Sequence, residues 1–291
     1  MIPISFDYHS PTSLDKAVEA LVSFGEEAKV IAGGQSLLPL MKLRLAQPRV
    51  LIDISKIKEL GGIQQEDDQI IIGALCTHYQ VESSELLEEK CPLLCQTAGF
   101  IGDSQVRNRG TVGGSLAHAD PAADLPAAFL ALGAELQVNG TQGNRRIQAE
   151  EFFYGVMTTA LKPTEILTAI KIPLLSGRTG TSYQKMEQKA SGFAIVGVAA
   201  VVILNEKGVC SEVGLGVTGV GSKPFRARAA EEKLKGKRLN PDLIESASAE
   251  ATQGVDALSD IHASAEFRAH LASVYTARAL GAALNEAAAR S

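Results

Sequence analysis

Two short segments, far apart in the 291-residue chain, carry the same local pattern of a glycine pair beside a serine. The first reads AGGQS at residues 32–36, and the second reads TVGGS at residues 111–115. Glycine has no Cβ, so it accepts positive φ and lets main-chain N–H groups approach an anion with no side chain in between. These two segments limit the fold more than any other feature, because each demands a tight turn.

We expect a helix after each glycine pair. The first helix is predicted at residues 37–45 and the second at residues 122–132, entered through Asp120 as N-cap and Pro121 as first helical residue. Brought together, the two loops could hold the two halves of a pyrophosphate through N–H groups and serine hydroxyls, without lysine or Mg²⁺. A single glycine pair is more typical of an ordinary turn, and that interpretation stays open for each loop taken alone.

The first 55 residues predict a β-α-β unit. Apolar residues recur at helical spacing over residues 14–22, and apolar runs at residues 29–32 and 50–54 read as strands flanking the helix after the first glycine pair. Its crossover is expected to be right-handed.

The rest of the chain predicts an α+β fold with a boundary in the polar segment 176–180. Before it, short strands at residues 69–73 and 134–138 bracket helical pieces. After it come three strand candidates, 181–185, 194–204 and 210–217, and then helices at residues 241–251 and 263–289.

Composition and charge exclude several functions. With 28 basic and 33 acidic residues the net charge is −5, so nucleic acid is not an expected partner. The most apolar stretch, residues 193–204, is too short to span a bilayer, and residues 1–7 lack the features of a secretory signal, so we expect a cytoplasmic chain. Four cysteines, with no second Cys or His pair at zinc-finger spacing, predict buried thiols and no metal site.

Other motifs compete with the two loops. GLGVTG at residues 214–219 matches the dinucleotide fingerprint, but the loop continues to Pro224 where a helix should open, so we read strand and turn. His118 and Asp120 invite a catalytic role, yet no nucleophile motif accompanies them. Arg107 and Arg109 could face a phosphate or a partner, although exposed arginines are more often simply solvated.

Taken in order, these and further motifs resemble one known family, the FAD-binding medium subunits of molybdenum hydroxylases, which include xanthine dehydrogenase and aerobic carbon monoxide dehydrogenase. The resemblance covers nearly the whole chain. It rests on FDY at residues 6–8, AGGQSL at 32–37, GA at 73–74 with Thr77, RNRGTVGGS at 107–115, DPAADLP at 120–126, EIL at 165–167 with IP at 172–173, and GVGSKP at 219–224.

The resemblance implies a two-lobed FAD-binding domain of the vanillyl-alcohol-oxidase (PCMH) type at residues 1–177, with lobes at about 1–55 and 56–177. A smaller domain like the carbon monoxide dehydrogenase flavoprotein C-terminal domain, with a three-stranded antiparallel sheet plus helices, would follow at residues 178–291. It implies no catalytic side chain, since the redox chemistry belongs to the flavin.

By the same resemblance, the FAD diphosphate is held by two runs of residues, which are Val30, Ile31, Ala32, Gly33, Gly34, Gln35, Ser36 and Leu37, and Thr111, Val112, Gly113, Gly114 and Ser115. Asp124 would contact the nucleotide portion, Ile101 and Leu167 would lie against the cofactor, and Lys185 would reach it from the C-terminal domain. Phe193 occupies a position where some relatives place a tyrosine near the isoalloxazine.

The implied role is electron transfer. In such enzymes the substrate is oxidised at a molybdopterin-containing large subunit, and electrons pass through [2Fe–2S] clusters of a small subunit to FAD on this chain. The acceptor could be NAD⁺, a quinone, oxygen or another carrier, and the assembly would be a dimer of heterotrimers.

Two alternatives stay open. A self-sufficient FAD oxidase of the vanillyl-alcohol-oxidase type would need its own substrate cavity and base. A non-catalytic module for a small anion or nucleotide would also be consistent with glycine loops and no catalytic triad.

Overall fold

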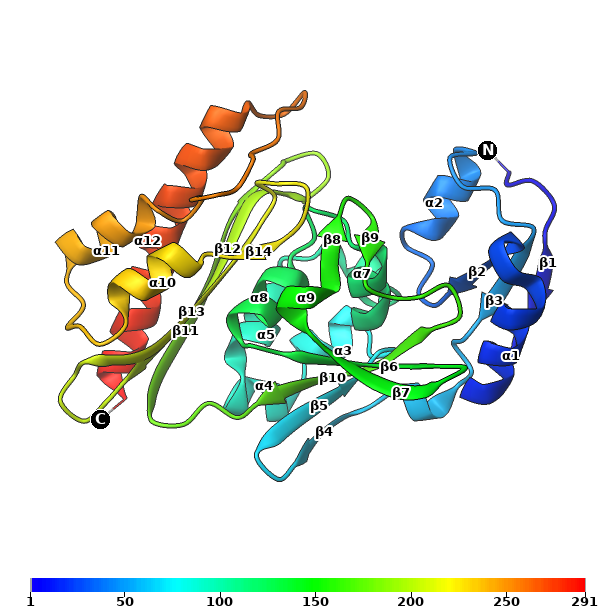
Figure 1. The fold of residues 1–291 in the computed structure, drawn as a ribbon, viewed down its shortest axis with the longest axis horizontal. Helices are drawn as coiled ribbons and strands as arrows, with labels where there is room; N and C mark the ends of the chain where they lie inside the picture. Colours follow the sequence, from blue (N-terminus) through cyan, green and yellow to red (C-terminus); the bar gives the residue numbers. More distant parts are fainter. Residues whose placement is uncertain (1, 291) are drawn as a thin grey trace.

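The computed structural model describes residues 2–290, which form three lobes in a row (Figure 1). The N-terminal lobe is a parallel sheet in the order β1-β3-β2. Its elements are β1 (Asp7–His9), α1 (Leu14–Phe24), the 3₁₀ turn η1 (Gly25–Glu27), β2 (Ala28–Ile31), α2 (Leu37–Lys42), β3 (Val50–Asp53) and the 3₁₀ turn η2 (Lys58–Leu60). Ala17, Val18 and Leu21 form the buried stripe of α1 that packs on this sheet. The expected β-α-β unit is present, with β2 and β3 paired in parallel.

The middle lobe is an antiparallel sheet in the order β4-β5-β10-β6-β7, covered by helices. Its strands are β4 (Ile63–Glu66), β5 (Gln69–Gly73), β6 (Glu135–Gly140), β7 (Gly143–Gln148) and β10 (Ile166–Pro173), with a small hairpin of β8 (Phe153–Gly155) and β9 (Thr158–Thr159). Its helices are α3 (His78–Glu82), α4 (Glu85–Lys90), α5 (Pro92–Gly99), α6 (Ser104–Arg107), α7 (Val112–His118), α8 (Leu125–Ala131) and α9 (Ala149–Phe152).

The C-terminal lobe is an antiparallel sheet in the order β11-β12-β13-β14. Its elements are β11 (Arg178–Glu187), β12 (Ala194–Leu204), β13 (Cys210–Thr218), β14 (Phe225–Arg226), α10 (Arg228–Leu234), α11 (Pro241–Ser248) and α12 (Ala265–Ala289). The three long strands are those expected from the sequence. The prediction of a three-stranded sheet is one strand short, because the two-residue β14 extends it.

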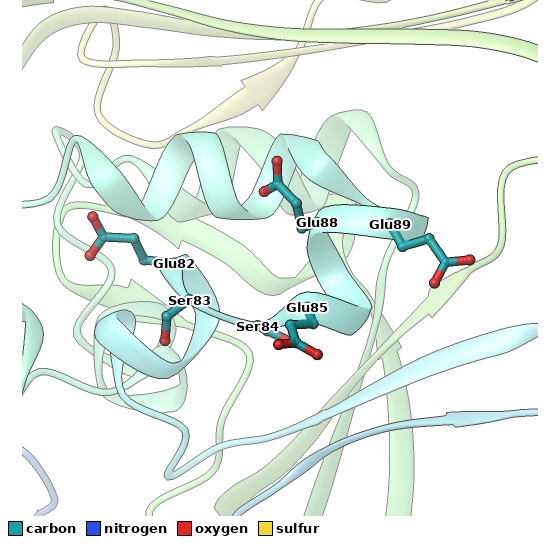
Figure 2. Close-up of a pocket in the computed structure, with 6 residues that line it drawn as sticks. All are labelled: Glu82, Ser83, Ser84, Glu85, Glu88 and Glu89. Carbon is teal, nitrogen blue, oxygen red and sulfur yellow. The ribbon is translucent and has the colours of Figure 1, made fainter.

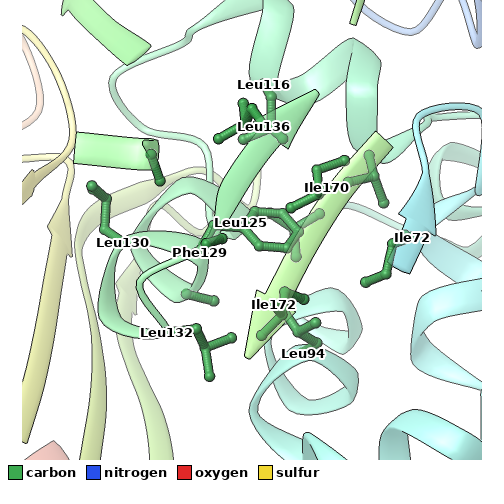
Figure 3. Close-up of a cluster of buried hydrophobic side chains, with 14 of the residues drawn as sticks. Ile72, Leu94, Leu116, Leu125, Phe129, Leu130, Leu132, Leu136, Ile170 and Ile172 are labelled. Carbon is green, nitrogen blue, oxygen red and sulfur yellow. The ribbon is translucent and has the colours of Figure 1, made fainter. Parts of the chain in front are cut away.

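Both faces of the C-terminal sheet are buried, which is why β12 reads as a continuous apolar run. Val198, Ala200 and Val202 belong to a core shared with α10, α11 and α12. The alternate residues Ala199 and Val201 join the core of the middle lobe, where α8 packs against β12 and β13. Figure 3 shows part of that second core around Phe129, Leu136 and Ile172. The middle and C-terminal lobes therefore share one continuous apolar interior.

The helices next to the glycine pairs differ from the sequence prediction. α2 ends at Lys42, before Arg44, which has φ 61°. The prediction of Asp120 as an N-cap is wrong, because its carboxylate accepts the N–H of Ala122 (2.9 Å) within a turn and α8 begins only at Leu125. The second glycine pair lies inside α7, which no local pattern had indicated.

The GLGVTG segment forms the end of strand β13 and then a turn at Gly219, as the sequence predicts. The polar segment 176–180 separates β10 from β11, and a domain division after residue 177 remains our proposal. Among residues 2–290, no helix is both long and apolar enough to cross a bilayer.

Candidate cofactor-binding site

The first glycine loop lies at the carboxyl edge of the N-terminal parallel sheet, directly after β2. Within the described chain, the N–H groups of residues 33–36 donate to no protein acceptor. Gly34 has φ +74°, the conformation for which glycine was expected. Gln35 and Ser36 are exposed. Four consecutive main-chain donors and a serine hydroxyl are thus available to an anionic group, which is the chemistry a diphosphate requires.

The second glycine pair does something different. The Gly113 N–H donates to the carbonyl of Ala74 (2.8 Å), and the Gly114 N–H donates to the hydroxyl of Thr111, the N-cap of α7 (3.1 Å). A Cβ at Gly113 would lie 2.5 Å from the Cβ of Ala74, so this glycine permits close packing. The prediction that both N–H groups of this pair hold a diphosphate is therefore wrong. The half-buried Ser115 hydroxyl has no protein partner among the described residues and remains available.

The two glycine segments nevertheless meet. A Cβ built at Gly33 would lie 2.8 Å from the carbonyl carbon of Arg109 and 2.9 Å from the Cα of Gly110, and closer still to the Arg109 oxygen. The first loop therefore rests directly on the main chain that leads into α7. The first loop thus lies against the two residues that directly precede the second segment, and the two segments contribute unequal sets of donors.

His78 supports this contact from behind and was missed by the sequence analysis. The main-chain N–H of His78 donates to the carbonyl of Gly110 (2.9 Å), and the His78 ring would lie 2.8 Å from a Cβ at that glycine. Thr77 and Gln80 cap the helix that carries His78 with a reciprocal capping box. Burial, aided by the charge of Arg107, lowers the pKa of His78 to about 4, so the ring is neutral near pH 7. The T-x-x-Q spacing is the sequence signal that could have located this helix start.

A second group of predicted residues gathers around the loop of residues 100–102. Ile101 is half-buried in this loop, and Lys185 donates to the carbonyl of Phe100 (3.1 Å). Phe193 stands 47% exposed at the tip of the β11–β12 hairpin, next to Gly192, whose missing Cβ would face Gly102. The structure therefore brings Ile101 of the middle lobe close to Lys185 and Phe193 of the C-terminal lobe.

Asp124 and Lys185 bind one another in the interior. The Lys185 ammonium lies 2.9 Å from one carboxylate oxygen of Asp124 and 3.0 Å from the other, and the phenol of Tyr183 donates to Asp124 (2.5 Å). The Lys185 side chain is 0% exposed, so no water competes for the pair. Burial and the Asp124 charge raise the pKa of Tyr183 well above its usual value, which keeps it a donor. Sequence analysis missed Tyr183, whose partner is 59 residues away.

The other predicted residues take these places. Val30, Ile31 and Ala32 end β2 or follow it and are half-buried, as is Leu37 at the start of α2. Leu167 is buried in β10 opposite Val138, beside a bulge. Val112 is fully buried in α7.

Of the competing residues, Arg107 turns inward onto Glu82 and main-chain carbonyls, which contradicts the interpretation that it faces a phosphate. Arg109 is exposed. Within residues 2–290 no group of three or more His, Cys, Asp or Glu side chains is arranged to hold a metal ion.

Comparison with known proteins agrees with this geometry. Residues 4–175 match the family described as "FAD binding domain in molybdopterin dehydrogenase", and residues 181–283 match "CO dehydrogenase flavoprotein C-terminal domain". The chain is 39% identical to the carbon monoxide dehydrogenase medium chain of Afipia carboxidovorans, with 96% of this chain and 97% of that one covered. It is 37% identical to the 6-hydroxypseudooxynicotine dehydrogenase complex subunit alpha of Paenarthrobacter nicotinovorans, covering 99% and 97%.

The fold agrees as closely. A solved carbon monoxide dehydrogenase from Hydrogenophaga pseudoflava, which lacks the Mo-pyranopterin moiety of its cofactor, superposes with a TM-score of 0.96 at 38% identity over 98% of this chain and 99% of that one. Both domain models match, and the relatives align over nearly the full length of the chain in sequence and in structure. The chain therefore belongs to the FAD-binding medium subunits of molybdenum hydroxylases.

Proposed function

We propose that this chain is the electron outlet of a molybdenum hydroxylase: its FAD receives electrons from [2Fe–2S] clusters on a partner subunit and passes them to an external acceptor. The observation that carries this proposal is that the N–H groups of residues 33–36 have no acceptor in the described part of the chain, while this loop packs against the main chain of Arg109 and Gly110. When bound, FAD supplies the electron-accepting chemistry, and the protein supplies its position and surroundings.

Different residues would contact different parts of the cofactor. The N–H groups of residues 33–36, with the hydroxyls of Ser36 and Ser115, would hold the diphosphate. The loop at Ile101 and the hairpin tip at Phe193 would lie against the ring system. The buried Asp124–Lys185 pair would fix the edge of the site that the C-terminal lobe provides.

The iron–sulfur clusters are assigned to another polypeptide. Cys91 and Cys95 are buried in the middle-lobe core, and burial raises the pKa of each thiol to about 12. A thiol with that pKa is a poor ligand, because metals bind the thiolate. We therefore propose a molybdopterin-containing large subunit and a [2Fe–2S] small subunit as partners, assembled as a dimer of heterotrimers. The organic substrate would be bound on the large subunit.

The test compares the isolated chain with the complex. The purified chain, incubated with FAD and desalted, should retain one flavin per chain that acid releases. Co-expressed with its partners, it should co-purify with molybdenum and iron, and its flavin should be bleached by the substrate of the complex. A colourless chain after reconstitution would refute the proposal. Turnover of a small alcohol by the isolated chain would favour a self-sufficient oxidase of the vanillyl-alcohol-oxidase type instead.

A further inference from the structure

Two of the three main-chain carbonyls in the loop at residues 100–102 are bound by one half-buried arginine, Arg107. The Nη1 of Arg107 donates to the carbonyls of Ile101 (3.1 Å) and Gly102 (3.1 Å), and its Nε donates to the carboxylate of Glu82 (2.7 Å). The side chains of Arg107 and Glu82 are only 18% and 30% exposed. A planar guanidinium can serve three acceptors in this fixed geometry, which a lysine ammonium on a flexible stem cannot reproduce.

The same loop is held from the other side by β11. The ring of Tyr183 meets the ring of Phe100 edge to face at 5.7 Å, and Lys185, two residues further along the strand, donates to the Phe100 carbonyl (3.1 Å). Side chains two residues apart point to the same face of a strand, so β11 presents both groups to the loop together. All three carbonyls of the loop therefore have cationic donors.

Glu82 lines one end of an acidic surface hollow that it shares with Glu88 and Glu89. Figure 2 shows the Glu82 carboxylate turned away from those of Glu88 and Glu89. Its ion pair with Arg107 accounts for that direction. Glu82 is thus the anchor that keeps the guanidinium under the loop.

We propose that Arg107 is a positioning residue for the flavin site, which sets the place of Ile101 by binding the carbonyls of the loop while Glu82 anchors it. This inference rests on the proposed function, because Ile101 is expected to lie against the cofactor. Removing Arg107 takes the donors from the carbonyls of Ile101 and Gly102 and from Glu82. Gly102 is exposed and the Glu82 side chain is 30% exposed, so water can replace the hydrogen bonds of these two. The fold should then persist while the loop loses its defined position.

The test uses the full-length chain and the variants R107M, R107K and E82Q, with R146M as the matched control. Arg146 lies on β7, is 63% exposed and pairs at 3.5 Å with Glu135 on β6, so its variant makes the same change in charge away from the loop. The measurements are the FAD dissociation constant, the visible absorption bands of the bound flavin and its midpoint potential. R107M should bind FAD about tenfold more weakly, about 1.4 kcal/mol, with altered bands and potential. R107K should be intermediate, E82Q should shift in the same direction by less, and R146M should match wild type.

Wild-type affinity, bands and potential in R107M would overturn the inference while leaving the proposed function intact. If R107M does not fold, R107K and E82Q decide by the same measurements, and wild-type values in both would overturn it. A loss of thermal stability with unchanged bands and potential would show a purely structural role and would also overturn it. Failure of the wild-type chain to bind FAD would instead count against the proposed function.

Discussion

Replacing Gly33 with alanine should separate the two glycine segments and weaken cofactor binding. The new Cβ would lie 2.8 Å from the Arg109 carbonyl carbon, and ordinary contact begins at 3.4 Å, so the backbones must part by at least about 0.6 Å. Overpacking of this kind costs about 1–3 kcal/mol. A displacement of that size would also lengthen a hydrogen bond from a loop N–H to the cofactor, from an N···O distance of about 2.9 Å to about 3.5 Å, the limit of hydrogen-bond range. Losing one bond to a charged oxygen costs about 1.5–3 kcal/mol, or about ten- to hundredfold in FAD affinity.

The assay is titration of the FAD-free chain with FAD, followed by flavin fluorescence, together with thermal unfolding with and without FAD. G155A is the matched control, because a Cβ at Gly155 meets nothing within 4 Å and its φ is not positive. The control should bind FAD like wild type. A folded G33A variant with wild-type affinity would refute the reasoning that contact between the two segments builds the site.

Three further predictions concern buried groups. K185M leaves the buried Asp124 carboxyl without its cationic partner, so chemical denaturation should show a loss of about 3–5 kcal/mol; a loss below 1 kcal/mol would contradict the pairing. The pKa of His78 is lowered from 6.5 to about 4, so its contribution is complete above pH 6.5 and lost as the pH falls; between pH 6.5 and 4 the wild type should lose about 3 kcal/mol more stability than H78Q, and parallel curves would contradict a buried neutral ring. Cys91 and Cys95, with pKa values raised to about 12 by burial, should not react with a thiol reagent in the native chain but should react in denaturant; fast native labelling would show that they are accessible.

Local sequence was sufficient where local forces decide the structure. The apolar stripe of α1, the parallel pairing of β2 with β3 and the three long strands β11, β12 and β13 all follow from hydrophobic periodicity. The glycine at position 34 predicted a positive φ, and Gly34 has a positive φ in the structure. The rejection of GLGVTG as a dinucleotide loop was also correct, because a helix cannot open where the chain runs on toward Pro224.

The equivalence of the two glycine pairs is where sequence reasoning failed. Both contain adjacent glycines near a serine, yet among residues 2–290 only the first pair leaves its N–H groups without a protein acceptor. The Gly113 N–H binds the carbonyl of Ala74, a residue 39 positions earlier, and no local pattern reveals that partner. Arg107 was misread for the same reason, since its acceptors lie on a separate helix and loop.

By itself, the sequence determined helix α1, the parallel β-α-β unit, the three long strands of the C-terminal sheet and, through ordered motifs, the family. Only the tertiary structure decided which main-chain donors remain available, that Asp124 and Lys185 form a buried pair, and that Arg107 binds the loop at Ile101. The physical reason is that periodicity and turn preference act over a few residues. A hydrogen-bonding group is satisfied instead by whatever folding brings within about 3 Å of it.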